Sequence, residues 1–247
     1  MTRKFTTQSF LICLLSGFCT TLFAAPTGTL PSTRFSSMPV TNITPPGWKP
    51  LLFGNIDRHT AYFLTRQNNK TVVQAVSHAS ASGYYLKTDI SPQNQPFINW
   101  QWKINRILNK GDVTSKDGDD YPARLYISFD YDKSKLEGGE RLKYNIYSLL
   151  YDTPPPLAVI NYIWDNHTPI NTIVNNAYSN RVKMIVVQSG KQNVGRWVAE
   201  KRNIIQDYID AFGEVPGNIS AIAIMTDTDN TGESATAWYG DIFFSVK

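Results

Sequence analysis

Period-two alternation of apolar and polar residues is the main pattern in this chain, and it predicts β-strands. The clearest case is residues 100–104, where Trp100, Trp102 and Ile104 share one face while Gln101 and Lys103 share the other. This pattern is typical of a strand with one buried face. Comparable strands are predicted at residues 51–53, 61–64, 71–76, 84–86, 125–129, 157–164 and 182–187, with a hairpin joining 61–64 to 71–76.

The C-terminal stretch from Ile219 to Val246 predicts a buried strand, an acidic turn and a return strand. Residues 221–225 are apolar without alternation, as in a strand buried on both faces. They are followed by the turn-forming residues 227–232. Alternation then resumes, with Trp238 and Ile242 expected on the same face. The chain is therefore predicted to turn back here and to end inside a sheet.

Two stretches change to the helical period. Residues 140–151 repeat apolar positions at helical spacing, and the prolines at 154–156 end them. From Trp197 to Phe212 the apolar residues form one stripe, interrupted by Lys201, and Gly213 is placed to end the helix. We therefore expect a mostly β fold, namely a jelly-roll-like antiparallel β-sandwich with two accessory α-helices. The second helix would expose Glu200, Arg202 and Asp207 to water.

The N-terminus has the pattern of a secretory signal peptide over residues 1–24. Arg3 and Lys4 precede an apolar run over residues 10–23, and the small residue Ala24 follows. The alternative is an uncleaved membrane anchor, for which this run is short. Residues 25–46 are a lead-in rich in Pro, Ser and Thr, and residues 47–247 are predicted to form a single domain. The protein is expected to be periplasmic or secreted, with no stable membrane span after cleavage.

Composition excludes several kinds of site. Cys13 and Cys19 both lie in the predicted signal peptide, so the mature chain has no disulfide, thiolate nucleophile or cysteine ligand. Of 24 Lys and Arg, two leave with the signal peptide, so 22 face 20 Asp and Glu at a net charge of +2. Nucleic acid is therefore not an expected partner. The histidines at 59, 78 and 167 have no metal-ligand spacing, which disfavours zinc.

Two acidic bends are the main candidate sites. The first holds Asp117, Asp119 and Asp120, with Arg124 close behind. One interpretation is a solvated loop in which an Arg–Asp pair braces the next strand. The alternatives are a site that binds a cation and a set of polar side chains that contacts a ligand.

The second bend, from Asp227 to Gly232, is similar to the first half of a calcium loop. Its alternate positions carry oxygen atoms, and Gly232 permits the bend. No acidic residue stands at the expected closing position, which is Trp238, so other carboxylates would have to come from Asp241 or from residues 117–120. The alternative is a turn bonded to its own backbone. The candidate calcium ligands are Asp227, Asp229 and Thr231.

Five pieces of the chain carry a family resemblance: WQWKI (100–104), DGDDYPARLYISF (117–129), INYIW (160–164), WVAEKRNIIQDYIDAFGEVP (197–216) and AIAIMTDTDNTGESATAWYGDIFF (221–244). They resemble a bacterial family named only as domain of unknown function 3047. Because that family is largely exported and has no established activity, the resemblance implies export and supplies no catalytic residues. The strand order is also similar to that of galactose-binding-like β-sandwich carbohydrate-binding modules, a likeness of fold alone.

The leading hypothesis is a non-catalytic domain that binds a glycan of the envelope or its surroundings. Aromatic faces would stack on sugar rings, and Asp and Arg would bond hydroxyl groups. One alternative is a hydrolase that pairs Asp119 or Asp120 with Asp227 or Asp229 in one cleft. Another is a structural envelope protein that binds a second protein. The candidate ligand-binding residues are Trp102, Asp119, Asp120, Arg124, Trp164, Asp227, Asp229 and Trp238.

Overall fold

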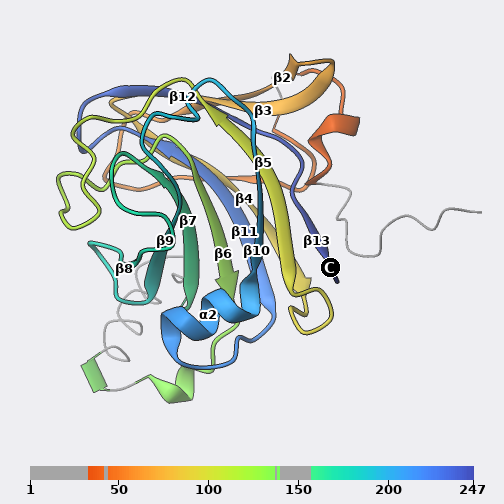
Figure 1. The fold of residues 1–247 in the computed structure, drawn as a ribbon, viewed down its shortest axis with the longest axis vertical. Coiled ribbons are helices and arrows are strands. Elements are labelled where there is room, and N and C mark those ends of the chain that lie inside the picture. Colours follow the sequence, from red (N-terminus) through yellow and green to blue (C-terminus); the bar gives the residue numbers. More distant parts are fainter. Residues whose placement is uncertain (1–32, 42–43, 137, 140–156) are drawn as a thin grey trace, which may run out of the picture.

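The computed structural model describes residues 33–41, 44–136, 138–139 and 157–247 (Figure 1). The predicted signal peptide, part of the lead-in and the predicted helix over residues 140–151 lie outside these ranges. Within the described ranges, no helix is long and apolar enough to cross a bilayer.

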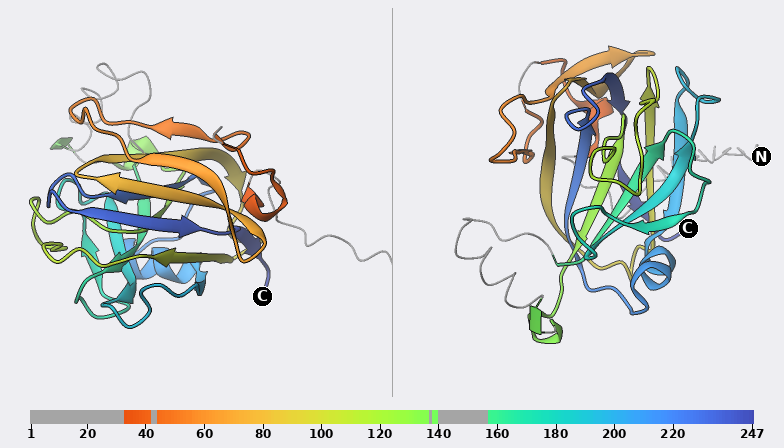
Figure 2. Two further views of the ribbon diagram at one scale, coloured as in Figure 1. Left: turned by 90° about the horizontal axis from the view of Figure 1, so that it is seen from above. Right: turned by 90° about the vertical axis from the view of Figure 1, so that its left-hand side faces the viewer.

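Two facing sheets make up the body (Figures 1 and 2). The seven-stranded sheet has the order β1 (Lys49–Leu51), β4 (Ala81–Ile90), β11 (Ile219–Asp227), β6 (Arg124–Phe129), β7 (Val159–Asp165), β9 (Val182–Ser189) and β8 (Ile173–Asn175). The six-stranded sheet has the order β10 (Val198–Asn203), β5 (Phe97–Ile104), β12 (Ser234–Tyr239), β3 (Lys70–His78) and β2 (Ala61–Gln67), and β13 (Phe243–Ser245) also pairs with β5. The protein is therefore a mostly β sandwich.

One strand pair departs from the predicted antiparallel arrangement. β7 and β9 run parallel, with Val159 opposite Val182. The chain can return in the same direction because β8 and its flanking turns lie between these two strands along the sequence. The other pairs in the two sheets are antiparallel, including the predicted hairpin of β2 and β3. Its two-residue turn, Asn68 and Asn69, has positive φ at both positions, as the twist of a tight hairpin requires.

The core lies between the two sheets, and β5 shows how alternation builds it. Trp100 and Trp102 point inward, as their spacing predicts, and both are buried. The ring of Trp100 stacks on Tyr162 of β7 with centroids 5.1 Å apart, and Trp102 lies 6.0 Å from Trp164. The outward positions of the same strand are half-buried. The aromatic side chains of β5 and β7 therefore join the sheets.

The predicted helix over residues 197–212 is correct only in its second half. α2 (Ile204–Phe212) lies across one end of the sandwich (Figure 1). It is capped by Asn203 at its N-terminus and by Gly213, where φ is 76°, at its C-terminus. The Asn203 side chain accepts a hydrogen bond from the backbone N–H of Gln206 at 3.1 Å. Residues 198–203 instead form β10, because they can pair with the open edge of β5 and because an Asn cap favours a helix that starts after it.

This change of structure also reverses the predicted exposure of three polar side chains. Glu200 accepts hydrogen bonds from Trp102 Nε1 at 3.2 Å and from Gln188 Nε2 at 2.8 Å. Arg202 forms an ion pair of 2.6 Å with Asp207, which is itself buried. Glu200 and Arg202 differ from expectation because a strand alternates its faces every residue, whereas a helix does not. Asp207 lies in α2 and is buried because it also accepts a hydrogen bond from the Tyr162 hydroxyl of β7 at 2.8 Å.

The last strand is interrupted, which changes the face assigned to Trp238. β12 buries Ala237 and Tyr239 and leaves Trp238 half-exposed, whereas β13 buries Phe244. Between them, Gly240 lies against β5, where an added Cβ would come within 2.5 Å of Gln101 Cγ. The predicted single strand is therefore wrong, because the break at Gly240 shifts the alternation by one position.

The end of the lead-in is packed onto the body. The short 3-10 helix η2 (Phe35–Ser37) buries Phe35 against Trp48, with ring centroids 5.5 Å apart. Asp241 accepts hydrogen bonds from the backbone N–H of Ser36 at 2.8 Å and from its hydroxyl. Asp241 therefore holds η2 and is not part of the acidic bends. A second 3-10 helix, η3, spans Lys133–Lys135.

Candidate functional site

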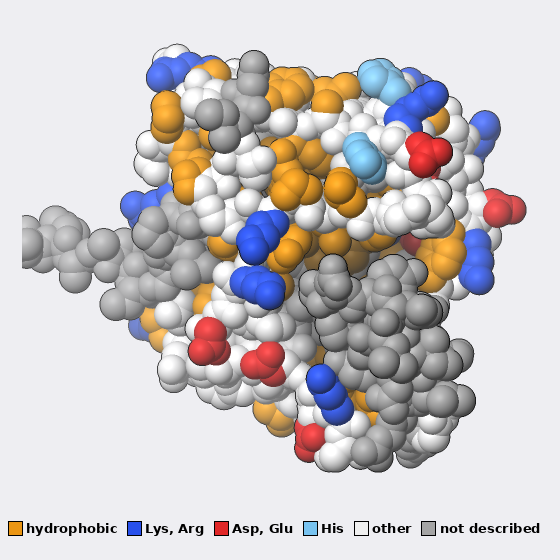
Figure 3. All heavy atoms as spheres, turned by 180° about the vertical axis from the view of Figure 1, so that it is seen from behind, with side chains coloured by type: hydrophobic (Ala, Val, Ile, Leu, Met, Phe, Trp, Pro, Cys, Tyr) orange, Lys and Arg blue, Asp and Glu red, His pale blue; other side chains and the backbone are white. Residues whose placement is uncertain are grey.

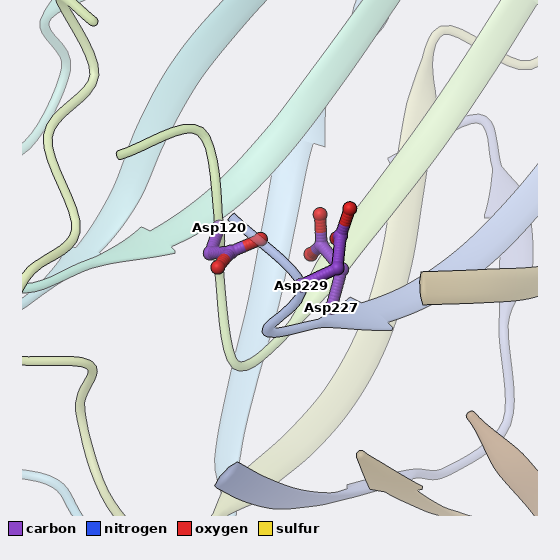
Figure 4. Close-up of side chains that lie close together, drawn as sticks. All are labelled: Asp120, Asp227 and Asp229. Atoms are coloured by element: carbon purple, nitrogen blue, oxygen red, sulfur yellow. The ribbon is translucent and has the colours of Figure 1, made fainter. Parts of the chain in front are cut away.

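The two acidic bends meet in space, as a calcium site supplied by residues 117–120 and the hydrolase alternative both require. β11 and β6 are antiparallel neighbours with Met225 opposite Arg124, so the loop after β11 lies beside the loop before β6. Carboxylate oxygens of Asp120, Asp227 and Asp229 all lie within 4.8 Å of one another (Figure 4). The pairing of two distant strands therefore creates a cluster of three carboxylates.

Arg124 is the centre of an ion pair under these bends. Its Nε donates to Asp227 Oδ1 at 2.8 Å, and its Nη2 bonds Asp227 Oδ2 and the carbonyl oxygen of Asp119. Its Nη1 lies 3.5 Å from Asp119 Oδ1 and 3.1 Å from the Tyr126 hydroxyl. The guanidinium also lies 4.3 Å from the centroid of the Tyr121 ring. The predicted Arg–Asp brace is therefore present, and it is only 2% exposed at Arg124.

The titration of this pair reflects its burial. Burial raises the pKa of Asp227, and Asp120 and Asp119 raise it further, while Arg124 opposes them. Burial lowers the pKa of Arg124, but the attraction of Asp227, Tyr126 and Asp119 together outweighs that effect, and the pKa lies above its usual range. The guanidinium is therefore the fixed charge of this cluster.

Asp120 and Asp229 form no ion pair with Arg124, and Asp119 shares the guanidinium with Asp227. Asp119 accepts a hydrogen bond from Asn176 Nδ2 at 3.0 Å. Asp120 is 1% exposed and accepts the backbone N–H of Thr231 at 2.6 Å through Oδ2, while its Oδ1 has no hydrogen-bond partner. Burial and then the neighbouring Asp120 raise the pKa of half-buried Asp229. Four carboxylates thus surround one guanidinium.

Trp102 and Trp164 are not available to a ligand, contrary to the prediction. Both are 0% exposed in the core, and their indole N–H groups donate to Glu200 Oε1 and to the carbonyl oxygen of Gly190. The reason is the parity of their strands, which places even-numbered residues of β5 and β7 between the sheets.

The outer face of the six-stranded sheet carries a line of side chains that we call the aromatic row. Trp238 pairs with Lys103 on one side and Gln74 on the other, and Gln74 pairs with Phe63. Trp197 immediately precedes Val198, which pairs with Trp102, so the register places Trp197 beside Lys103. All five row members are half-buried. The left view of Figure 2 looks onto this sheet.

Lys103 lies between the two indoles of the row. Its Nζ is 4.2 Å from the ring centroid of Trp238 and 5.5 Å from that of Trp197. The ammonium donates to Gln67 Oε1 at 2.7 Å, and burial lowers its pKa. Among the described residues, Lys103 forms no ion pair with a carboxylate. An ammonium held by rings and an amide is thus directed to the surface of the sheet.

Of the row members, the sequence analysis named Trp238 as a candidate ligand-binding residue and did not name Trp197 or Lys103. Trp197 was assigned to a helical stripe, and that assignment placed it in the core. The interruption of the stripe by Lys201 was the available signal. Lys201 lies on the outer face of β10, with its Nζ 4.7 Å from the centroid of the Phe97 ring on β5.

Charge is dispersed on the face opposite to that of Figure 1. Lys and Arg side chains are interspersed with Asp and Glu there, with hydrophobic side chains between them (Figure 3). This arrangement agrees with the nearly neutral balance of the sequence.

Comparison with known proteins confirms the family resemblance. Residues 46–243 match the family model described as protein of unknown function (DUF3047), and the chain belongs to that family. No curated protein matches the sequence. Among solved structures, the chain is similar to the family 11 carbohydrate-binding module of cellulosomal cellulase Lic26A-Cel5E of Clostridium thermocellum. The identity is 8%, the TM-score is 0.43, and the match covers 90% of this chain and 96% of that one.

Proposed function

We propose that this DUF3047 protein is an exported, non-catalytic glycan-binding protein, and that the glycan lies along the aromatic row. The observation that carries this proposal is the register, which aligns Trp197, Trp238 and Phe63 across the sheet. Trp238 and Phe63 lie on β12 and β2, and Trp197 directly precedes β10, so the three rings fall at every second strand position. Neighbouring strands are about 4.8 Å apart, so successive rings are roughly 10 Å apart. Rings at a regular spacing on a rigid sheet suit a chain of sugar rings that crosses the strands.

The polar members of the row give the proposed site its chemistry. Lys103 uses one N–H for Gln67, which leaves the ammonium able to donate to ligand oxygens. Gln74 places an amide between Trp238 and Phe63. Because the ammonium faces no described carboxylate, a glycan that carries carboxylate groups would satisfy it best. We therefore expect acidic glycans to bind more tightly than neutral ones.

The hydrolase alternative receives less support from the acidic cluster. Asp120 and Asp227 are 1% and 2% exposed, and both oxygens of Asp227 are bonded by Arg124. A glycosidic bond would have to approach these carboxylates closely. The protein-binding alternative could use the same aromatic row, so the experiment must separate it from glycan binding.

Calorimetric titration with polygalacturonate, alginate, peptidoglycan fragments, xylan and soluble cellulose derivatives tests the proposal. Trp238→Ala and Trp197→Ala are each expected to weaken binding at least tenfold, as for the aromatic anchors of other interfaces. Lys103→Met is expected to weaken only the acidic ligands. Tyr178→Ala is the matched control, because Tyr178 is 60% exposed but bonds the acidic-bend residues Asn230 and Lys116 instead of the row.

Flat titrations for every glycan would refute the proposal, as would an equal loss in Tyr178→Ala. Recovery of one envelope protein by the wild type but not by Trp238→Ala, without glycan binding, would favour the protein-binding alternative instead.

A further inference from the structure

We propose that Asp120, Asp227 and Asp229 bind a calcium ion that ties the loop before β6 to the loop after β11. This site is separate from the aromatic row and does not depend on glycan binding. Its three carboxylates come from two segments more than 100 residues apart in sequence. A hydrogen bond from the backbone N–H of Thr231 to Asp120 Oδ2, across 111 residues, already joins these segments. Figure 4 shows the carboxylate of Asp120 directed toward the other two.

The spacing of the oxygens fits a single ion. Calcium lies about 2.3–2.6 Å from each oxygen ligand, so two ligands of one ion can be at most about 5 Å apart. Oxygens of all three residues lie within 4.8 Å of one another. The donors are hard oxygen atoms, which suit calcium better than zinc. Calcium also tolerates the irregular geometry of two converging loops, whereas magnesium requires a closer and nearly regular octahedron.

An unpartnered oxygen points independently to a ligand. Asp120 is only 1% exposed, so water does not reach its carboxylate. Nevertheless, its Oδ1 accepts no hydrogen bond from the described residues. A buried carboxylate oxygen without a partner is costly, and native structures rarely leave one unexplained. The neighbouring cation cannot serve it, because Arg124 is committed to Asp227 and Asp119.

The charge of the cluster also calls for a cation. Asp119, Asp120, Asp227 and Asp229 face the single guanidinium of Arg124, and the ammonium of Lys110 lies at the rim, where it bonds the carbonyl oxygen of Thr231 at 3.1 Å. Two negative charges therefore remain uncompensated, which equals the charge of one calcium ion. Thr231 orients Asp120 through its N–H, and its own role as a ligand stays a prediction.

A shared proton is the competing explanation. Asp229 has a raised pKa and lies close enough to Asp120 for a hydrogen bond between the two carboxyl groups. In that case one proton would satisfy Asp120 Oδ1, and added calcium would have no effect. The two explanations therefore predict opposite responses to calcium at neutral pH.

Thermal unfolding and calorimetry with calcium chloride, after treatment with EDTA, distinguish them. The wild type is expected to bind one calcium ion per chain and to melt at a higher temperature in calcium than in EDTA. Equal concentrations of magnesium chloride should produce a smaller shift. Asp229→Asn removes one of three carboxylates without touching the Arg124 pair, and it should weaken calcium affinity at least tenfold.

In EDTA, where no calcium is bound, Asp229→Asn should raise the melting temperature, because it removes the repulsion between Asp229 and Asp120. In calcium, the same variant should gain less in melting temperature than the wild type does. Asp117→Asn is the matched control, because it makes the same change in an exposed residue of the loop that carries Asp120. It should leave calcium affinity unchanged. The inference would be overturned if the wild type gave no heat and no calcium-dependent shift, or if Asp229→Asn bound calcium as tightly as the wild type. Trp238→Ala should bind calcium normally, so failure of the glycan proposal would not remove this site.

Discussion

Replacing Arg124 by Met removes the guanidinium that pairs with Asp227. The structure allows the cost to be worked out, because Asp227 would lose both of its bonds to the guanidinium and Asp119 would lose its ion pair. Breaking a buried pair by removing one partner costs about 3–5 kcal/mol. Total stabilities of domains are about 5–15 kcal/mol, so this loss is a large fraction. For a domain of about 200 residues it corresponds to a fall in Tm of roughly 6–20 °C.

Urea unfolding in EDTA, followed by tryptophan fluorescence, measures this loss. Arg124→Met with Asp227→Leu should recover much of the stability, because an apolar pair of similar volume replaces a buried ion pair at little cost. A loss below about 1 kcal/mol in the single variant would refute the reasoning, since buried pairs that lose a partner cost several times that. A double variant no more stable than the single one would refute it too.

The stability that Arg124→Met loses relative to the wild type should depend on pH. Burial raises the pKa of Asp227, and Arg124 is the group that opposes this rise. Without Arg124, the folded-state pKa of Asp227 lies further above its unfolded value of about 3.9. The protonated form then stabilises the fold at low pH, and that stability is lost as the pH rises through the folded-state pKa. The deficit of Arg124→Met should therefore be smallest near pH 4 and should grow toward pH 7.

Two further predictions concern β10 and α2. Asn203→Ala should destabilise the protein by about 1 kcal/mol, because the side chain caps the backbone N–H of Gln206; urea unfolding would show this, and an equal loss in Asp210→Ala, an exposed position of the same helix, would contradict it. Burial raises the pKa of Glu200, so the wild type loses stability as the pH rises above about 4.3 through the folded-state pKa. Glu200→Gln removes that titration, and its stability relative to the wild type should rise between pH 4 and 7; a constant difference across this range would exclude the mechanism.

β10 and α2 show which helix boundary can be predicted from neighbouring residues and which cannot. The end of the helix could be predicted, because Gly213 and the apolar stripe of residues 204–212 act within a few residues. Its beginning could not, because residues 198–203 fit either period and the deciding partner was the open edge of β5, about 100 residues earlier. Trp238 illustrates the same limit, since the break at Gly240 depends on contact with Gln101.

Some features of the candidate sites could likewise be predicted from the sequence, and others could not. The sequence identified both acidic bends and Arg124, because Asp, Thr and Gly have strong turn preferences and the charges are concentrated. It did not separate Trp102, which lies in the core, from Trp197, which lies on the surface. Both are tryptophans in apolar segments, and only the facing sheet decides which side of a strand is buried.

By itself, then, the sequence determined the period of most strands, the end of one helix and the two turns that carry the carboxylates, because backbone preference and hydrophobic alternation act over a few residues. The tertiary structure decided strand order, the parallel pair β7 and β9, and the alignment of Trp197, Lys103 and Trp238 across neighbouring segments of one sheet. It also brought Asp120 to Asp227 and Asp229. These features depend on hydrogen bonds between strands that are distant along the chain, and the pairing partner of such a strand is set by the packing of the whole core.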